Sequence, residues 1–265
     1  MSPDDLPTRR RSPHAWRFMA LWFERFFRRH MNGLRLARWG EPERAQDGGP
    51  LVVYSNHPAW WDAALYILLA HRLFPSFACY APIDAAMLGK YGVFGRIGAF
   101  GVDLHSPRGA ASFLRASADV LSEPARALWI TAQGRFADPR ERPVSLRPGI
   151  ARLPELAPTA RFLPLAIEYS FWTERGAEAL VAFGPTMAGA ELAALSREDR
   201  LARLEAALTR TMDRLAQDVV TREPERFTPL LEGKPGVGGV YDGWRRLKAR
   251  LHGRRFDPAH REPAA

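Results

Sequence analysis

Residues 57 and 62 carry the two side chains of this sequence that are best placed to exchange protons. The stretch "VVYSNHPAWWDAAL", residues 52–65, has His57 just after an apolar run and Asp62 five positions later. An imidazole accepts a proton near neutral pH. A carboxylate bound to its protonated ring nitrogen fixes the tautomer and leaves the other nitrogen free. His57 and Asp62 are therefore a candidate general base and its orienting partner.

The elements around these two residues must bring the side chains together. The apolar run 51–56 is predicted to be a buried strand, and Pro58 favours the first turn of a helix over 58–72. His57 would then lie at the helix N-terminus, where the helix dipole disfavours the charged imidazolium, with Asp62 about one turn further on. The alternative is structural: His57 caps the helix and Asp62 faces solvent.

From residue 51 onward, apolar strand-like runs alternate with helical segments. This alternation predicts an α/β fold with a mixed, largely parallel sheet flanked by helices. Ligands of such sheets bind beyond the carboxyl ends of strands, which is where His57 is expected. Further strands are predicted at 76–82, 99–104, 126–131, 161–170 and 179–185, with helices at 82–95 and 107–121, a loop over 132–147, and an amphipathic helix opened by the capping box Ser196–Asp199.

The segment "AWRFMALWFERFFRRHM", residues 15–31, gathers its charged residues on one helical face beside a wide aromatic face. Aromatic residues edged by arginines are typical of a helix that lies in a membrane interface, although such a helix can also dock on its own core. The domain organisation predicted from composition is a disordered basic tail at 1–13, an amphipathic membrane-interface helix at 14–40, an α/β domain at 41–220 and a basic C-terminal extension at 221–265.

The charge of the chain points to anionic partners. Lys and Arg number 38 against 29 acidic residues, which gives a net charge of +9, and all but three of the basic residues are arginine. This excess suits nucleic acid, an anionic membrane surface or a phosphorylated co-substrate, but no recognition-helix pattern supports nucleic acid. Cys79 is the only cysteine, and the seven histidines show no ligand-like pairing. The sequence therefore predicts neither a disulfide framework nor a metal site.

Several blocks of the chain, in order over about residues 50–190, resemble the glycerolipid acyltransferases of the lysophosphatidic acid acyltransferase-like superfamily. "NHPAWWD" resembles the H-x4-D motif of that family. "GRIGAFGVDLHSPRGAASF" resembles its second block, "LWITAQGRF" the strand that enters its third, "LRPGIARL" the Lys/Arg-x-Gly segment that follows, and "FLPLAIEY" its late strand. The third block differs, because Gln133 stands where the family has Glu.

The resemblance implies roles for particular residues. His57 and Asp62 match the catalytic pair, and it implies substrate-binding roles for Arg108, Gln133, Gly134 and Arg135. Backbone N–H groups around Gly134 would stabilise the developing oxyanion. Arg108 and Arg135 would bind phosphate oxygens, since a guanidinium binds them through two parallel bonds. The N-terminus after Ser106-Pro107 would also favour an anion.

The implied function is acyl transfer from acyl-CoA or acyl carrier protein to a hydroxyl of a lysolipid-like membrane acceptor, with no other cofactor. The activity expected is of the 1-acylglycerol-3-phosphate O-acyltransferase type, in phospholipid biosynthesis. The protein would work as a peripheral protein on the cytoplasmic face of a membrane. Two alternatives stay open: a non-catalytic basic membrane-binding protein on the same fold, and a lipid or thioester hydrolase that activates water through His57.

Overall fold

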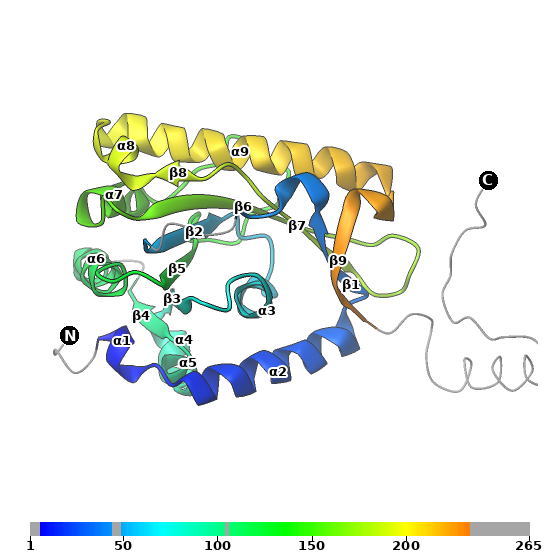
Figure 1. The fold of residues 1–265 in the computed structure, drawn as a ribbon, viewed down its shortest axis with the longest axis horizontal. Helices are drawn as coiled ribbons and strands as arrows, with labels where there is room; N and C mark the ends of the chain where they lie inside the picture. The colour runs from blue at the N-terminus through cyan, green and yellow to red at the C-terminus, as the bar shows by residue number, and fades with distance from the viewer. Residues whose placement is uncertain (1–5, 44–48, 104–105, 234–265) are drawn as a thin grey trace, which may run out of the picture.

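The computed structural model describes residues 6–43, 49–103 and 106–233, and the structural statements below concern these residues. They form an α/β fold in which a mixed, mostly parallel sheet lies between two layers of helices (Figure 1). The sheet has nine strands, in the order β4-β3-β5-β2-β6-β7-β1-β9, and β8 pairs with β6. The predicted fold class is confirmed.

The strands are short, and most of their residues are buried. Their bounds are β1 Gly33–Ala37, β2 Leu51–Ser55, β3 Ala78–Asp84, β4 Ala99–Val102, β5 Arg126–Thr131, β6 Arg161–Ser170, β7 Glu178–Phe183, β8 Met187–Ala188 and β9 Phe227–Glu232. Strand β2 is buried along its whole length, as expected for a central strand covered on both faces.

The helices cover both faces of the sheet. Their bounds are α1 Pro7–Arg10, α2 Pro13–His30, α3 Asp62–Leu73, α4 Ala85–Lys90, α5 Val93–Arg96, α6 Pro107–Val120, α7 Leu153–Leu156, α8 Gly189–Ala193 and α9 Arg197–Thr221, with 3₁₀ turns at Arg38–Gly40, Pro148–Arg152 and Pro224–Arg226. Helix α9 begins with the predicted cap, since the Ser196 hydroxyl accepts the Asp199 N–H at 3.1 Å.

The direction of the strands determines where the loops meet. Strands β4, β3, β5, β2 and β6 run parallel to one another, whereas β7 is antiparallel to β6. The carboxyl ends of the five parallel strands therefore lie at one edge of the sheet. The loop after β2, which carries His57, leaves this edge between the ends of β5 and β6.

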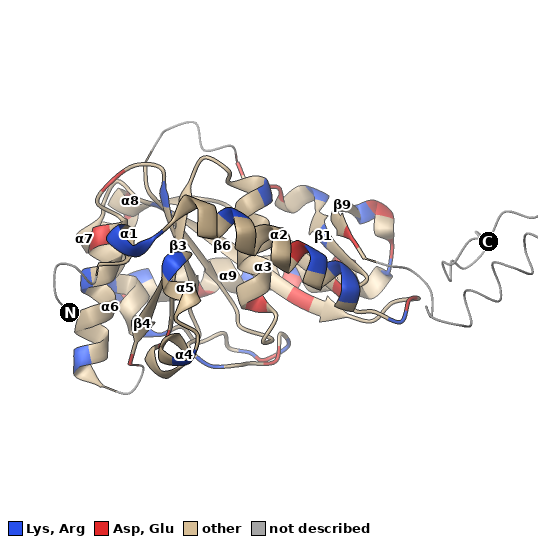
Figure 2. Cartoon of the chain, turned by 90° about the horizontal axis from the view of Figure 1, so that it is seen from below, with Lys and Arg blue, Asp and Glu red and all other residues tan. Residues whose placement is uncertain are grey.

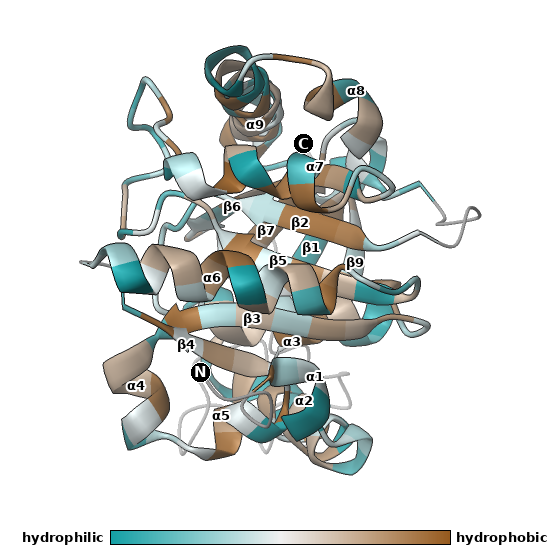
Figure 3. Cartoon of the chain, turned by 90° about the vertical axis from the view of Figure 1, so that its left-hand side faces the viewer, coloured by the Kyte–Doolittle hydropathy of each residue, from teal (hydrophilic) through white to brown (hydrophobic). Residues whose placement is uncertain are grey.

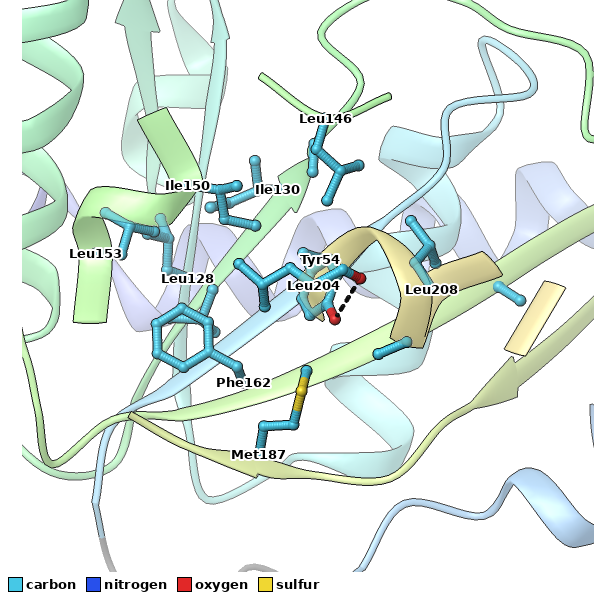
Figure 4. Close-up of a cluster of buried hydrophobic side chains, with 14 of the residues drawn as sticks. Tyr54, Leu128, Ile130, Leu146, Ile150, Leu153, Phe162, Met187, Leu204 and Leu208 are labelled. Atoms are coloured by element: carbon cyan, nitrogen blue, oxygen red, sulfur yellow. Dashed lines mark hydrogen bonds between the residues drawn. The ribbon is translucent and has the colours of Figure 1, made fainter. Parts of the chain in front are cut away.

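Two hydrophobic cores fill the space between the layers. One lies between the sheet and helices α6–α9, and in it the buried Tyr54 hydroxyl donates to the Leu204 carbonyl at 3.2 Å (Figure 4). The other lies between the sheet and helices α2 and α3 and includes Trp129. In Figure 3, β2 is hydrophobic over most of its length, whereas α6 and α9 alternate between hydrophobic and hydrophilic positions. This pattern is that of a buried strand between half-exposed helices.

Helix α2 packs across α3 with one face and leaves another exposed. Met19, Phe23 and Phe27 are buried in the second core. Phe18 and Trp22 are exposed on the opposite side. The docked half of the aromatic surface thus has a structural role, while Phe18 and Trp22 stay exposed although Trp22 stacks on Phe26 of the same helix.

The folded part of the chain extends beyond the limits of 41 and 220 that the sequence predicts for the α/β domain. Strand β1 pairs with β7, and β9 pairs with β1 at the edge of the sheet. Where a disordered tail is predicted at 1–13, α1 forms and Thr8 donates to the Asp119 carboxylate of α6 at 2.6 Å. Residues 1–5 and 234–265, at the ends of the predicted tail and C-terminal extension, lie outside the described residues.

Arg200, in the first turn of α9, joins this helix to α8 and to the segment around α7. Its side chain is 2% exposed. The guanidinium donates to the carbonyls of Ala151, Leu192, Ala193 and Leu195, and it pairs with the Glu155 carboxylate at 2.8 Å. One arginine therefore satisfies the carbonyls at the end of α8 and joins α9 to the turn before α7.

Replacing Arg200 by Leu should lower the free energy of unfolding by about 3–5 kcal/mol, because it removes five hydrogen bonds and takes the guanidinium donor away from the carbonyls of Ala151, Ala193 and Leu195. The matched control is Arg197→Leu on the same helix, whose exposed guanidinium pairs with the same Glu155 carboxylate. An exposed pair contributes about 0–1 kcal/mol. Urea unfolding of both variants checks this, and equal small losses would contradict the role given to Arg200.

Candidate active site

Asn56 is the first residue of the loop that carries His57, and its side chain fixes the start of this loop. Its side chain is fully buried. Its amide nitrogen donates to the Ile167 carbonyl at 2.8 Å, and its amide oxygen accepts the Ile167 N–H at 2.9 Å. The side chain thus continues the β2–β6 pairing one residue past the end of β2, while the main chain is free to turn away.

The backbone of His57 is held from the loop that follows β5. Its N–H donates to the Gln133 side-chain oxygen at 2.9 Å, and its carbonyl accepts the Ala137 N–H at 3.0 Å. Gln133 is almost fully buried. The structure therefore gives this predicted substrate-binding residue a contact with the candidate base itself.

The side chains of His57 and Asp62 are in contact, with 2.6 Å between Nδ1 and Oδ2. The Asp62 side chain is 0% exposed, whereas that of His57 is 21% exposed. A carboxylate at Nδ1 favours the tautomer that carries its proton there, which leaves Nε2 as the acceptor. The arrangement is that of a partly open base held by a buried carboxylate.

Helix α3 begins at Asp62 and not at Pro58, so this part of the prediction was wrong. The Asp62 N–H donates to the Ala59 carbonyl at 3.2 Å, and Asp62 Oδ2 accepts the Ala59 N–H at 3.2 Å. These two bonds close a turn over 59–62 before the helix starts. The N-terminal end of the helix dipole therefore acts first on the Asp62 carboxylate, which it stabilises.

Tyr169 is a member of the site that sequence reasoning missed. Its hydroxyl donates to Asp62 Oδ1 at 2.8 Å from near the end of β6. Burial raises the pKa of Tyr169 well above its usual value, and the neighbouring Asp62 charge adds to the effect. The phenol therefore stays protonated and acts as a donor at physiological pH.

A second buried phenol lies beside the site. Tyr66 of α3 shares a hydrogen bond of 2.5 Å with the Ser55 hydroxyl, and burial raises the pKa of Tyr66. The tyrosine is therefore neutral at physiological pH. It extends the polar network under the loop toward the end of β2.

Phe136 covers the imidazole and is a second residue that sequence reasoning missed. The ring centroids of His57 and Phe136 are 4.3 Å apart, with an angle of 33° between their planes. The phenylalanine itself is 59% exposed. The exposed ring of Phe136 offers a ligand an apolar surface beside the candidate base. A ligand can pack against this ring or push it aside to reach the imidazole. Its signal in the sequence is only its place three residues after Gln133.

Gly134 and Arg135, the other predicted substrate-binding residues of this loop, are already engaged in contacts within the protein. Gly134 has a φ of +64°, and a Cβ there would lie 2.8 Å from Cγ of Arg147. Its N–H donates to the Thr131 carbonyl at 3.0 Å. The N–H of Gly134 is therefore already bonded, and the glycine serves the turn. Arg135 is half-exposed and pairs with the Glu141 carboxylate.

Arg108 lies further from the base. It is exposed in the first turn of α6, where the Ser106 hydroxyl accepts the Gly109 N–H at 3.1 Å. Strands β3 and β5 separate β4, which precedes this helix, from β2. At about 4.8 Å per strand, the two loops leave the same edge about 14 Å apart. The structure thus places Arg108 on the same edge as His57 but not beside it.

Cys79 lies inside the sheet, on β3. Burial raises the pKa of its thiol to about 12. The thiol is therefore protonated at neutral pH and unsuited to act as a nucleophile. Its position fits that of a small apolar core residue.

Comparison with known proteins adds nothing to these observations. No protein-family model matches the chain, and no curated protein sequence matches it.

Replacing Asn56 by Ala should lower the free energy of unfolding by about 2–4 kcal/mol, because it leaves the buried N–H and carbonyl of Ile167 without partners. Asn56→Asp should be destabilising at pH 7, since one carboxylate oxygen would face the Ile167 carbonyl. Urea unfolding of both variants at neutral pH measures these losses.

The Asp variant also has a pH signature. Burial, with one oxygen against the Ile167 carbonyl, raises the folded-state pKa of the introduced carboxyl above its unfolded value, so folding favours the protonated form. The deficit of Asn56→Asp relative to the wild type should therefore shrink as the pH falls from 7 to 5, because the protonated carboxyl can donate to Ile167. A deficit that is equal at the two pH values would contradict the pairing described here.

Proposed function

We propose that the protein is an acyltransferase that moves a fatty acyl group from acyl-CoA or acyl carrier protein to a hydroxyl of a lysolipid-like acceptor. The observation that supports it most is the contact of 2.6 Å between His57 and the fully buried Asp62 at the carboxyl edge of the sheet. The pair has the spacing of the H-x4-D motif of the glycerolipid acyltransferases, and further blocks that resemble this family follow in order.

In the proposed reaction, the acceptor hydroxyl gives its proton to Nε2 of His57 while its oxygen attacks the thioester carbonyl. The carbon–sulfur bond then breaks, and the departing thiolate takes the proton from the imidazolium. Asp62 stabilises the imidazolium through the bond at Nδ1. No covalent bond between the protein and the acyl group is needed.

The negative charge on the thioester oxygen requires donors that are already in place. The N–H of Gly134 is bonded to Thr131, so we assign this role to the backbone N–H groups of Arg135 and Phe136, for which no acceptor is found among the described residues. They follow the glycine in the loop that holds His57. The negative charge would thus be stabilised next to the base.

The surroundings of His57 favour an apolar acceptor over water. Phe136 lies on the imidazole, and the exposed Trp60 lies in the same loop as the base. Neither residue offers an ionic contact to a phosphate. We assign the phosphate-bearing part of the donor to the N-terminal turn of α6 and Arg108, about 14 Å across the edge of the sheet.

The exposed face of α2 gives the protein a way to reach an acceptor in a bilayer. Leu21 and Trp22 are exposed there, with Arg25 and Arg29 on the same side of the helix. Basic positions recur along α2 in the view from below (Figure 2). A basic residue near an anionic leaflet contributes about 1 kcal/mol to binding. Among the described residues, no helix is long and apolar enough to cross a membrane.

We therefore propose peripheral attachment through α2, on the cytoplasmic face, where acyl-CoA and acyl carrier protein are available. The helix also contacts the catalytic loop. Phe26 packs on Trp61, the residue before Asp62, with 5.2 Å between the ring centroids. The proposed membrane surface and the base are thus neighbours.

His57→Ala should reduce acyl transfer by about 10²–10⁴-fold, the usual contribution of a general base. Asp62→Asn should also reduce it strongly, because an amide cannot stabilise the imidazolium by charge. The measurement uses purified protein, labelled acyl-CoA or acyl carrier protein and a membrane lipid extract, with the product lipid identified by mass. His71→Ala, on the last turn of α3, is the matched control and should keep full activity.

The products separate the proposal from its alternatives. A new acyl lipid made by the wild type and not by His57→Ala supports transfer and identifies the acceptor. Free fatty acid without an acyl lipid would favour the hydrolase. No product with either donor would favour the non-catalytic protein.

Membrane attachment is tested separately from activity. The double variant Phe18→Ser, Trp22→Ser should reduce partition onto vesicles of phosphatidylglycerol and phosphatidylcholine by at least about tenfold, because two exposed aromatic side chains no longer enter the interface. Val220→Ser on α9, an exposed apolar position on the other side of the sheet, is the control and should bind normally. Unchanged sedimentation of the double variant would remove α2 as the attachment site.

A further inference from the structure

The Asp62 carboxylate is enclosed to an unusual degree for a group that carries a charge. It is 0% exposed, and no Lys or Arg pairs with it among the described residues. Its two oxygens accept three hydrogen bonds: His57 Nδ1 and the Ala59 N–H donate to Oδ2, and the Tyr169 hydroxyl donates to Oδ1. A buried carboxylate depends on such donors to remain ionised.

Tyr169 differs from the other two donors in where it comes from. His57 and Ala59 belong to the same loop as Asp62, whereas Tyr169 is 107 residues away on β6. Its backbone is fixed by pairing with Ala179 of β7. The phenol is therefore held by the sheet and not by the loop. It binds the oxygen that points away from the imidazole.

We propose that Tyr169 is a positioning residue for the base, which sets both the orientation of the Asp62 carboxylate and the proton affinity of the His57–Asp62 pair. This inference rests on the proposed function for its meaning, although its first test does not require activity. By binding Oδ1, the phenol directs Oδ2 toward Nδ1 of His57. By donating to the anion, it also makes the carboxylate a weaker base.

The effect on the pair has a definite sign. The pair carries one negative charge when His57 is neutral and none after His57 takes a proton. A donor to the carboxylate stabilises the negatively charged state, so it holds protonation of the pair to lower pH. Loss of the Tyr169 hydroxyl should therefore make His57 hold its proton to higher pH.

The other groups around the pair leave this role to Tyr169. From α3 the titratable neighbour is Tyr66, whose hydroxyl is bonded to Ser55 and is neutral. The loop after β5 presents the uncharged Gln133 and Phe136, together with the Arg135–Glu141 ion pair. From α2, His30 lies against Phe26 and Trp61, with ring centroids 4.5 Å and 6.2 Å away. None of these donates to Asp62 Oδ1 among the described contacts.

The experiment compares the variants Tyr169→Phe and Tyr66→Phe in the full chain. Each removes one buried hydroxyl next to the pair and keeps the ring, so both should fold, as judged by circular dichroism. NMR titration of the His57 ring is the first readout and needs no substrate. In Tyr169→Phe the titration should move to higher pH by about 0.5–1 unit, while in Tyr66→Phe it should stay within about 0.2 unit of the wild type.

The second readout is the pH dependence of acyl transfer. In Tyr169→Phe the acid limb of kcat/KM should move up by the same amount, and kcat should fall by about 3–30-fold with little change in KM. Asp62→Asn, in which the carboxylate is absent, should show no further shift on adding Tyr169→Phe.

The two readouts keep the inference and the proposed function apart. If the His57 titration is unchanged in Tyr169→Phe, or moves equally in Tyr66→Phe, the positioning role is wrong whatever the activity. If the titration moves as expected and no acyl lipid forms with any donor, the role of Tyr169 stands and the proposed function fails.

Discussion

The site depends on the side chain of Asn56, which makes the hydrogen bonds that the backbone of one further strand residue would make. Asn56 pairs with both backbone groups of Ile167, so β2 remains joined to β6 after its main chain has turned toward the edge of the sheet. This pairing brings two distant stretches of the chain together. His57 follows Asn56 in the loop, Asp62 begins the helix after this loop, and Tyr169 follows Ile167 on β6. The residue that follows the strand therefore aligns the base, its carboxylate and the phenol that binds this carboxylate.

Much of this arrangement could be predicted because it is local. An apolar strand followed by His57, with Asp62 five residues later, favours contact between the two side chains through local structure alone. The order of strands and helices likewise follows from the hydrophobic pattern. The start of α3 could not be predicted so well, since Pro58 favours a first helical turn. The turn over 59–62, closed by the Asp62 carboxylate, competes with it.

The remaining parts depend on contacts across the chain, which a pattern of residues does not contain. Tyr169 has no local signal, because its role follows from the pairing of β2 with β6 and the burial of Asp62. Gln133 occupies a motif position, but its bond to the His57 backbone depends on how two loops meet. Strand β9 was missed because it contains Pro229, which is tolerated here since β9 lies at the edge of the sheet.

The hydrogen bonds that fix His57 come from the backbone and side chains at the edge of the sheet, whereas the exposed residues beside His57 make few such bonds. Phe136 and Trp60 are exposed, and the Arg135–Glu141 pair lies at the surface. Substitutions at these outer positions need not disturb Asn56, Asp62 or Tyr169. Relatives of this chain could therefore diverge in what they recognise while keeping the same proton chemistry, and selection on the two properties would act on separate sets of residues.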